Sequence, residues 1–164
     1  MNIRNIRNRW AWVPVLIGMG LAILGCSLFS RGLLIPSTGQ KSAINGEQIY
    51  LTATSQRGDP ITFTMGGGMV MRPGGMACVS CHGPDGKGGQ VRMMMGSFTA
   101  PDIRYSALTS SQDTDHPAYT DETIKRAITQ GLDPAGKSLD WPMPRWSMSD
   151  QDLNDLIDYL KTLK

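Results

Sequence analysis

The stretch CVSCHGPDGKGG, residues 78–89, holds two of the three cysteines of this 164-residue chain and one of its two histidines. Cys78 and Cys81 are separated by two residues, and His82 follows directly. Paired cysteines serve disulfides, zinc sites, redox dithiols and covalent cofactor attachment, and each use makes its own demand on the neighbouring residues. The fold of the chain depends on which of these uses applies.

The surroundings of the pair favour one use. A structural zinc site needs four N or S ligands, and the remaining candidates here are Cys26 and His116. A redox dithiol usually lies in a βαβ context, which the sequence lacks, and a disulfide does not require His82. C-x-x-C-H is the attachment signature of c-type haem, with two thioether bonds and the histidine as proximal iron ligand. We therefore predict one covalent haem c; the alternative is a redox cysteine pair beside an unrelated histidine.

A sixth iron ligand must come from a separate segment. WPMPRW (141–146) offers Met143 between two prolines, which stiffen the loop and reduce the entropy lost in holding a thioether in place. His116 lies in a polar run and is interpreted as a solvated loop histidine. The competing methionines are Met71, Met76, Met93, Met94, Met95 and Met148.

Three helices are expected in the second half and at the start of the domain. Thr120 is a candidate N-cap for DETIKRAITQ, with Gly131 as its terminator, and Ser149 is the candidate cap of the last helix. Ser42 is the candidate cap of AINGEQIYLTAT, where Gly46 suggests close approach by another helix. The apolar face of the last helix is Leu153, Leu156, Ile157, Leu160 and Leu163, and that of the first is Ile44, Tyr50 and Leu51.

The connecting segments are rich in glycine and proline, so they are expected to be loops. Residues 56–77 are read as a long loop that contains the strand-like run ITFT and one hairpin. Residues 83–118 are interpreted as mostly loop, and residues 131–148 as loop.

The N-terminal segment predicts export and membrane attachment. Residues 10–29 contain no charged side chain, and about 20 apolar residues suffice to cross a bilayer. Arg4, Arg7 and Arg9 precede them, and positive flanks stay in the cytoplasm. We expect a cytoplasmic N-terminus over 1–9, a transmembrane anchor over 10–29, a linker over 30–42 and an exported domain over 43–164. A cleaved signal peptide and a lipoprotein signal at Cys26 are the alternatives, and both also export the domain.

The charge pattern gives little support to nucleic acid as a partner, and none is expected. Residues 1–40 carry four arginines and no acid, whereas residues 41–164 carry 12 basic and 14 acidic residues. No basic stripe with interleaved aromatic residues follows, so binding to nucleic acid has little support.

Taken in order, these motifs resemble the class I monohaem cytochromes c over residues 43–164. The resemblance is carried by Gly46 with Tyr50, CVSCHG (78–83), the Pro101–Asp102 pair, ITQGLD, the MP pair at 143–144 and DLNDLIDYLKTL. It implies an all-α cytochrome c fold, with few helices and long loops around one haem, preceded here by one transmembrane helix. The 56–77 segment is an insertion relative to the simplest members.

The resemblance also implies roles for single residues. Cys78 and Cys81 are the thioether sites, His82 is the proximal ligand and Met143 the distal ligand. The carbonyl of Pro101 accepts the Nδ1–H of the proximal histidine. Gly46 and Tyr50 cross the terminal helix near Leu156 and Tyr159. On composition and neighbourhood only, and not through the resemblance, Arg104, Tyr105 and Trp146 are candidates for contacts to the haem propionates; the alternative for each is an ordinary surface or packing role.

These features predict an electron carrier and not an enzyme, because ligation by histidine and methionine leaves no open iron position. The expected location is the cell membrane, as a single-pass protein with its haem domain on the outer, periplasmic or extracytoplasmic face. The expected partner is a membrane redox complex of the respiratory chain, such as a quinol-oxidising complex, a terminal oxidase or reductase, or another cytochrome. No small-molecule substrate is expected.

Two other functions stay open at this point. A haem-based sensor or enzyme would need a labile distal ligand. Copper handling would use the soft thioethers of the methionine-rich loops, namely Met65, Met69, Met71, Met76 and Met93–Met95.

Overall fold

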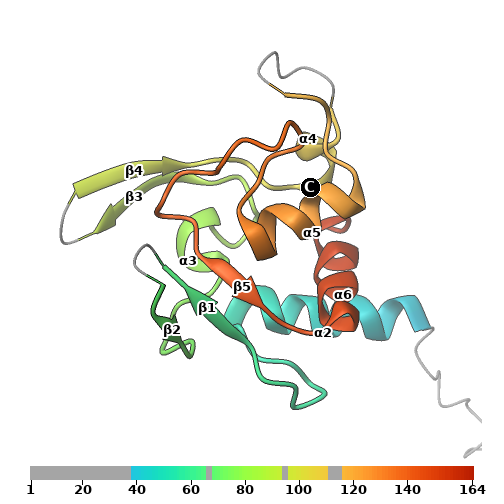
Figure 1. The fold of residues 1–164 in the computed structure, drawn as a ribbon. Coiled ribbons are helices and arrows are strands. Elements are labelled where there is room, and N and C mark those ends of the chain that lie inside the picture. Colours follow the sequence, from blue (N-terminus) through green and yellow to red (C-terminus); the bar gives the residue numbers. More distant parts are fainter. Residues whose placement is uncertain (1–37, 66–67, 94–95, 111–115) are drawn as a thin grey trace, which may run out of the picture. The chain divides into compact units, whose positions relative to one another are not determined.

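The arrangement of the helices is set by the crossing of the first described helix with the last (Figure 1). The computed structural model describes residues 38–65, 68–93, 96–110 and 116–164. Its helices are α2 (Thr38–Thr52), α3 (Val79–His82), α4 (Tyr105–Leu108), α5 (Asp121–Gln130) and α6 (Asp150–Leu160). All described residues belong to one compact unit, Pro36–Lys164. The predicted anchor, residues 10–29, lies outside them.

Gly46 is the point where α2 touches α6. A Cβ on Gly46 would lie 2.8 Å from the Cβ of Tyr159 and closer still to the α6 backbone. The expected crossing is therefore present, and the ring centroids of Tyr50 and Tyr159 lie 5.3 Å apart beside it.

The first helix departs from its predicted start and face. It begins at Thr38, so residues 38–42 of the expected linker are helical, and Ser42 lies inside the helix. The Ser42 hydroxyl does not cap α2; its Oγ lies 2.6 Å from Asp155 Oδ1 and 2.7 Å from Asp158 Oδ2, and its single proton can be donated to either carboxylate. Ile44 and Leu51 are 43% and 40% exposed, because the buried face runs through Asn45, Gly46, Ile49, Tyr50 and Ala53.

A buried polar cluster joins α2, the start of the insertion and α6. Asn45 Nδ2 donates to Asp152 Oδ1 at 2.9 Å and to Asp155 Oδ2 at 2.7 Å. Arg57 forms ion pairs with the same two carboxylates, at 2.7 and 2.5 Å. Ser55 Oγ adds a hydrogen bond to Asp152 at 2.8 Å. We call Asn45, Ser55, Arg57, Asp152 and Asp155 the Asp152 cluster; Asp152 Oδ1 accepts hydrogen bonds from three of its members, whereas the buried Asp152 Oδ2 has no partner among the described residues.

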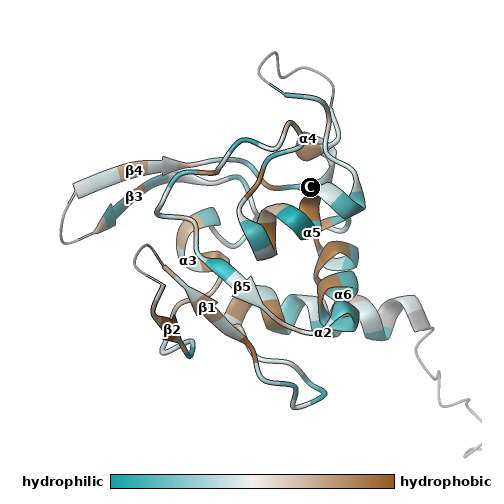
Figure 2. Ribbon diagram, viewed as in Figure 1, coloured by the Kyte–Doolittle hydropathy of each residue, from teal (hydrophilic) through white to brown (hydrophobic). Residues whose placement is uncertain are grey.

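The caps predicted for α5 and α6 are confirmed. Thr120 accepts from the Thr123 backbone in a capping box, and α5 ends at Gly131 in the left-handed conformation. Ser149 accepts from the Asp152 backbone N–H at the start of α6. Its predicted apolar face is buried at Leu153, Leu156, Ile157 and Leu160, and hydrophobic and hydrophilic residues alternate along the α6 ribbon (Figure 2).

Strands are the main departure from an all-α expectation. β1 (Thr62–Thr64) pairs antiparallel with β2 (Val70–Met71), as the predicted hairpin requires. The sequence did not indicate β5 (Arg145–Ser147), which pairs with the other edge of β1 in the order β2-β1-β5. It also missed β3 (Gly89–Met93) and β4 (Gly96–Ala100), which form an antiparallel ribbon that projects away from the helices (Figure 1).

The core lies between these elements. Its fully buried members include Ile49, Tyr50, Leu156 and Ile157 from the two crossing helices. Phe63 of β1 and Trp146 of β5 extend the core under the small sheet, with ring centroids 5.0 Å apart. Within residues 38–164, as far as they are described, no helix has the length and apolar character needed to cross a membrane.

Candidate functional site

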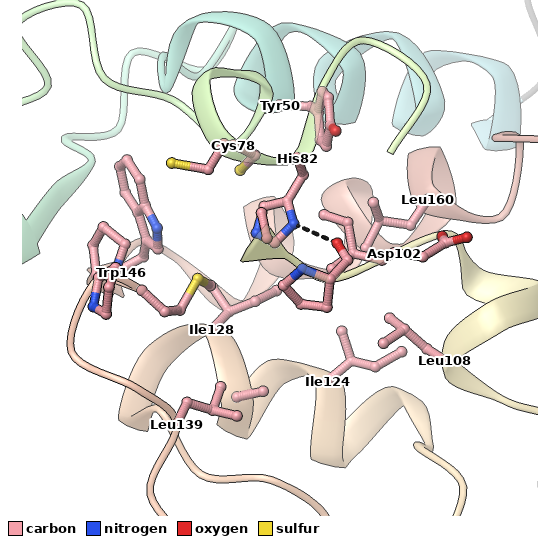
Figure 3. A pocket seen from close by; sticks show the side chains of 18 of the residues that line it. Tyr50, Cys78, His82, Asp102, Leu108, Ile124, Ile128, Leu139, Trp146 and Leu160 are labelled. Atoms are coloured by element: carbon pink, nitrogen blue, oxygen red, sulfur yellow. Dashed lines mark hydrogen bonds between the residues drawn. The ribbon is translucent and has the colours of Figure 1, made fainter. Parts of the chain in front are cut away.

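Residues 78–82 form a single helical turn. The backbone N–H groups of Cys81 and His82 both donate to the carbonyl of Cys78, at 3.2 and 2.9 Å, and Gly83 N donates to Val79 O at 3.0 Å. No disulfide joins the two thiols. Figure 3 shows Cys78 and His82 directed into one cavity. The turn therefore presents two sulfurs and one imidazole to the same space.

His82 has a defined tautomer. Its side chain is buried, at 6% exposure, and its Nδ1 lies 3.0 Å from the carbonyl oxygen of Pro101. A carbonyl only accepts, so Nδ1–H donates and Nε2 keeps its lone pair. Burial lowers the pKa of His82, and the bond to Pro101 opposes this only in part. The neutral imidazole thus offers Nε2 as a ligand, with the backbone partner that the resemblance implies.

Gly88 allows Pro101 to reach the histidine. Its N–H donates to the His82 carbonyl at 2.9 Å. A Cβ on Gly88 would lie 2.1 Å from Ala100 O and 2.5 Å from Pro101 O. Only a residue without a side chain lets the two segments approach this closely. This role was not predicted from the sequence, although the GKGG run after the cysteines was the available signal.

The cavity next to the turn has a volume of about 540 Å³, within the range of ~300–1,000 Å³ typical of ligand sites. Figure 3 shows α3 on one side of it, with Ile124 and Ile128 of α5 and Leu139 on the opposite side. Further apolar lining comes from Phe98, Ala100, Leu108, Ala127, Leu156 and Leu160. A large apolar space with two thiols and one free imidazole nitrogen fits an iron porphyrin.

Among the methionines that the structure describes, those lining the cavity are Met76, Met143 and Met148. Met76 lies two residues before Cys78, on the segment that carries the proximal turn. Met143 comes from a separate segment, is half-buried and packs against the core. Met71 packs against the core but does not line the cavity, and Met94 and Met95 lie outside the described residues. Among the described methionines, Met76 and Met148 therefore remain as the alternatives to Met143 for the sixth iron ligand.

The three candidate propionate contacts lie in different surroundings. Trp146 lines the cavity and is 4% exposed. Arg104 does not line it; its guanidinium binds the Asp102 carboxylate, with Nε 3.0 Å from Oδ2. Tyr105 also lies outside the lining and donates to Asp121 Oδ1 at 2.8 Å. The structure brings only Trp146 to the cavity, because both other side chains have local carboxylate partners.

His116 differs from its sequence interpretation. It is half-buried and lines the cavity instead of standing in a solvated loop. Its ring lies edge-on to Tyr119, with centroids 5.1 Å apart. Tyr119 lines the same cavity, so this aromatic pair is part of the wall that the sequence analysis missed.

The electrostatics of the turn argue against a redox dithiol. Burial raises the pKa of Cys78 to about 12 and raises that of Cys81 as well. Reactive dithiols have lowered pKa values that favour the thiolate. Among the described residues, no group of three or more His, Cys, Asp or Glu side chains is arranged to hold a metal ion. The raised pKa values of both thiols argue against dithiol chemistry at this site.

The turn is fastened to the helix crossing. Tyr50 of α2 donates its hydroxyl to the Gly83 carbonyl at 2.5 Å, directly after His82. Tyr50 is completely buried, and burial, together with nearby acidic groups, raises the pKa of its phenol. It remains a neutral donor at any ordinary pH. The position of the turn is therefore coupled to the packing of α2 on α6.

A comparison with protein-family models matches residues 43–164 to the family described as Cytochrome c. The matched region begins inside α2 and includes the turn, the cavity and α6. No curated protein and no solved structure matches the chain significantly.

Proposed function

Because the chain belongs to the cytochrome c family, we propose that it is a one-electron carrier with His82 and Met143 as the two axial ligands of its haem. Haem c is the covalent, iron-containing cofactor of this family, and Cys78, Cys81 and His82 form its attachment motif. When bound, the haem supplies a centre that gains and loses one electron. The protein holds that centre and sets its surroundings.

The proximal side of the proposal is supported by His82. Its Nδ1–H is held by Pro101 O at 3.0 Å, which fixes the ring and leaves Nε2 as the ligand atom. Such a bond also makes the imidazole a better donor. The buried position of the ring excludes water from this side.

The distal side is supported by Met143. It lines the same cavity from a segment distant in sequence, and a proline precedes and follows it. Two protein ligands leave no iron position for a substrate, so the site suits electron transfer and not bond-making chemistry. Methionine ligation also raises the reduction potential.

The experiment is purification of the full chain after maturation in its own export pathway. We expect the mass of one covalently added haem, and the weak far-red absorption band that marks ferric haem with a thioether ligand. Met143→Leu removes this band, whereas Met148→Leu and Met76→Leu keep it. A protein without added haem mass contradicts the whole proposal. If the wild-type protein carries haem but lacks the band, the result instead favours His116 as the sixth iron ligand, or an open iron position.

Tethering to a membrane is the second part of the proposal. It is supported by the uncharged residues 10–29 and by the arginines before them. Because α2 begins at Thr38, only residues 30–37 separate the proposed anchor from the haem domain, a reach of at most ~30 Å when fully extended. The haem domain would then work close to the outer face of the membrane that holds the anchor. Extraction by detergent but not by alkaline carbonate is the expected behaviour, and release by carbonate would contradict it.

A short tether favours a partner fixed in the same membrane. We propose a quinol-oxidising complex, a terminal oxidase or reductase, or another membrane cytochrome of a respiratory chain as that partner. Residues 41–164 carry two more acids than bases, so docking through a strongly basic ring is not expected. Blue-native separation of mildly solubilised membranes should show the haem in a large assembly, and haem only in free monomer would contradict a subunit role.

A further inference from the structure

Arg145 follows the proposed distal ligand by two residues and binds back onto the loop that carries it. Its Nη1 donates to the carbonyl oxygen of Met143 at 2.5 Å, and its Nη2 donates to that of Leu139 at 2.9 Å. One planar guanidinium thus joins the two ends of the 139–143 segment. Leu139 and Met143 both line the cavity, so these two bonds fix a part of its wall.

The guanidinium rests against the end of α5. A Cβ on Gly131 would lie 1.7 Å from Arg145 Nε and 1.8 Å from its Cζ. Gly131 terminates α5 with φ 68° and is buried. Its carbonyl also accepts from the Leu139 N–H at 2.8 Å. Because Gly131 has no side chain, the guanidinium of Arg145 can lie directly against its backbone. The end of α5 is therefore linked to the 139–143 segment twice, by this contact and by the hydrogen bond from Leu139.

The backbone of Arg145 is fixed from the opposite direction. It belongs to β5, where it pairs with Thr64 of β1, while Trp146 pairs with Phe63. The inserted segment thus holds the chain immediately after Met143 by strand pairing. The side chain and the main chain of one residue are immobilised by two separate parts of the fold.

The contacts of Arg145 are directed to the loop and not to a counter-ion. Among the described residues, no carboxylate forms an ion pair with its half-buried guanidinium, and both of its hydrogen bonds go to backbone carbonyls. A charged donor strengthens such bonds, and the planar fork of arginine matches two acceptors at once. Lysine cannot reproduce that geometry with a single ammonium.

We propose that Arg145 is a positioning residue that holds the Met143 thioether at the distal side of the haem, an inference that rests on the proposed function. Without its two bonds, the 139–143 segment gains freedom and Met143 competes less well against an added ligand. The residue itself does not touch the iron. Its effect acts through the loop.

The test uses the purified holoprotein and imidazole as a competing ligand, with the far-red band and the spectral shift on imidazole binding as readouts. Arg145→Gln should increase imidazole affinity about tenfold or more, because two hydrogen bonds from a charged donor are lost. Arg145→Lys keeps the charge but not the fork, so its affinity should lie between those of wild type and Arg145→Gln.

Arg126→Gln is the matched control. Arg126 Nη2 also donates to two backbone carbonyls after α5, those of Asp133 at 2.5 Å and Pro134 at 3.0 Å, without contact to Met143. This variant should lose thermal stability but keep the wild-type imidazole affinity. An equal affinity increase in Arg126→Gln would overturn the inference, since the effect would then be one of general loop stability.

The remaining outcomes separate the inference from its premise. A wild-type protein without the far-red band overturns both Met143 ligation and the role of Arg145. A wild-type protein with the band, combined with unchanged imidazole affinity in Arg145→Gln, overturns the role of Arg145 alone. If Arg145→Gln fails to mature, Arg145→Lys decides: raised affinity supports the inference and wild-type affinity overturns it.

Discussion

The backbone of Gly46 lies against the carbonyl of Asp155, so closely that a Cβ on Gly46 would be 1.9 Å from that oxygen. The nearest obstacles are the carbonyl oxygen and carbon of Asp155 in the α6 backbone, which cannot rotate away as a side chain can. We expect Gly46→Ala to lower the free energy of unfolding by about 2 kcal/mol, because overpacking outweighs the better helix propensity of alanine. Thermal and denaturant unfolding measure this.

Gly39 provides the control in the same helix. A Cβ at Gly39 meets nothing within 4 Å. Gly39→Ala should therefore leave stability unchanged or raise it slightly. If both alanine variants behave alike, the helix crossing does not depend on a bare backbone at Gly46.

Gly88→Ala should raise the reduction potential. The new Cβ would collide with Ala100 O and Pro101 O and move the Pro101 carbonyl away from His82 Nδ1. A histidine without this acceptor donates less electron density to the iron, which favours the reduced state. Redox titration of the holoprotein measures the shift.

Gly89→Ala is its control, because it shares the backbone strain and not the collision. Gly89 has φ 124° and a Cβ there would meet no atom within 4 Å. A shift of equal size in both variants would show that strain in the GKGG run, and not the Pro101 bond, sets the potential.

Phe63→Ala should destabilise the protein by about 3–5 kcal/mol, the usual cost of removing a buried aromatic ring. Phe63 is 4% exposed, and its ring contacts Trp146 across the β1–β5 pair. Because β5 follows Met143 closely, the far-red band should also weaken at temperatures below global unfolding. Val70→Ala on the neighbouring strand β2 is the control, since Val70 is 66% exposed. A band that persists up to global unfolding in Phe63→Ala would contradict the coupling of the insertion to the distal loop.

Acid should weaken the Asp152 cluster. Burial raises the pKa of Asp152, but bonds from Asn45, Ser55, Ser149 and Arg57 outweigh it and hold the pKa below its usual value. The charged carboxylate therefore stabilises the fold fully above the pKa of an unfolded aspartate, about 4. This contribution is lost as the pH falls through the lower folded pKa.

Asp152→Asn tests this pH dependence. We expect a loss of about 2–3 kcal/mol at neutral pH, from weakened charge-assisted bonds, and a shallower decline of stability below pH about 4. Asp150→Asn, an exposed acid in the first turn of the same helix, should keep the wild-type profile. Identical acid limbs in all three proteins would exclude Asp152 as a source of the decline.

The parts of the fold that the sequence predicted depend on local signals. Thr120 with Gly131, and Ser149 with the leucine spacing of α6, lie within one helix each, so the pattern of neighbours suffices. The same holds for the C-x-x-C-H turn. Gly46 was also informative, because a glycine inside a helix needs a reason and a crossing supplies one.

The parts that were missed depend on contacts between distant segments. The pairing of Thr64 with Arg145 joins residues far apart along the chain, and nothing in RWS indicates a strand by itself. Ser42 was assigned as a cap because its carboxylate partners on α6 were not visible. The ion pair of Arg104 with Asp102, two residues away, was also not foreseen, and the contact of Arg104 to the haem propionates stays a prediction.

Two kinds of interaction hold the insertion that starts after α2. Arg57 ties its base to α6 through charge, whereas β1 ties its middle to β5 through main-chain bonds and aromatic packing. Protonation of Asp152 weakens the charged contacts at the base, whereas the main-chain bonds of β1 and the contact between Phe63 and Trp146 do not titrate. Acid is therefore expected to loosen this segment first at its base, and only below pH about 4, while β1 stays paired with β5.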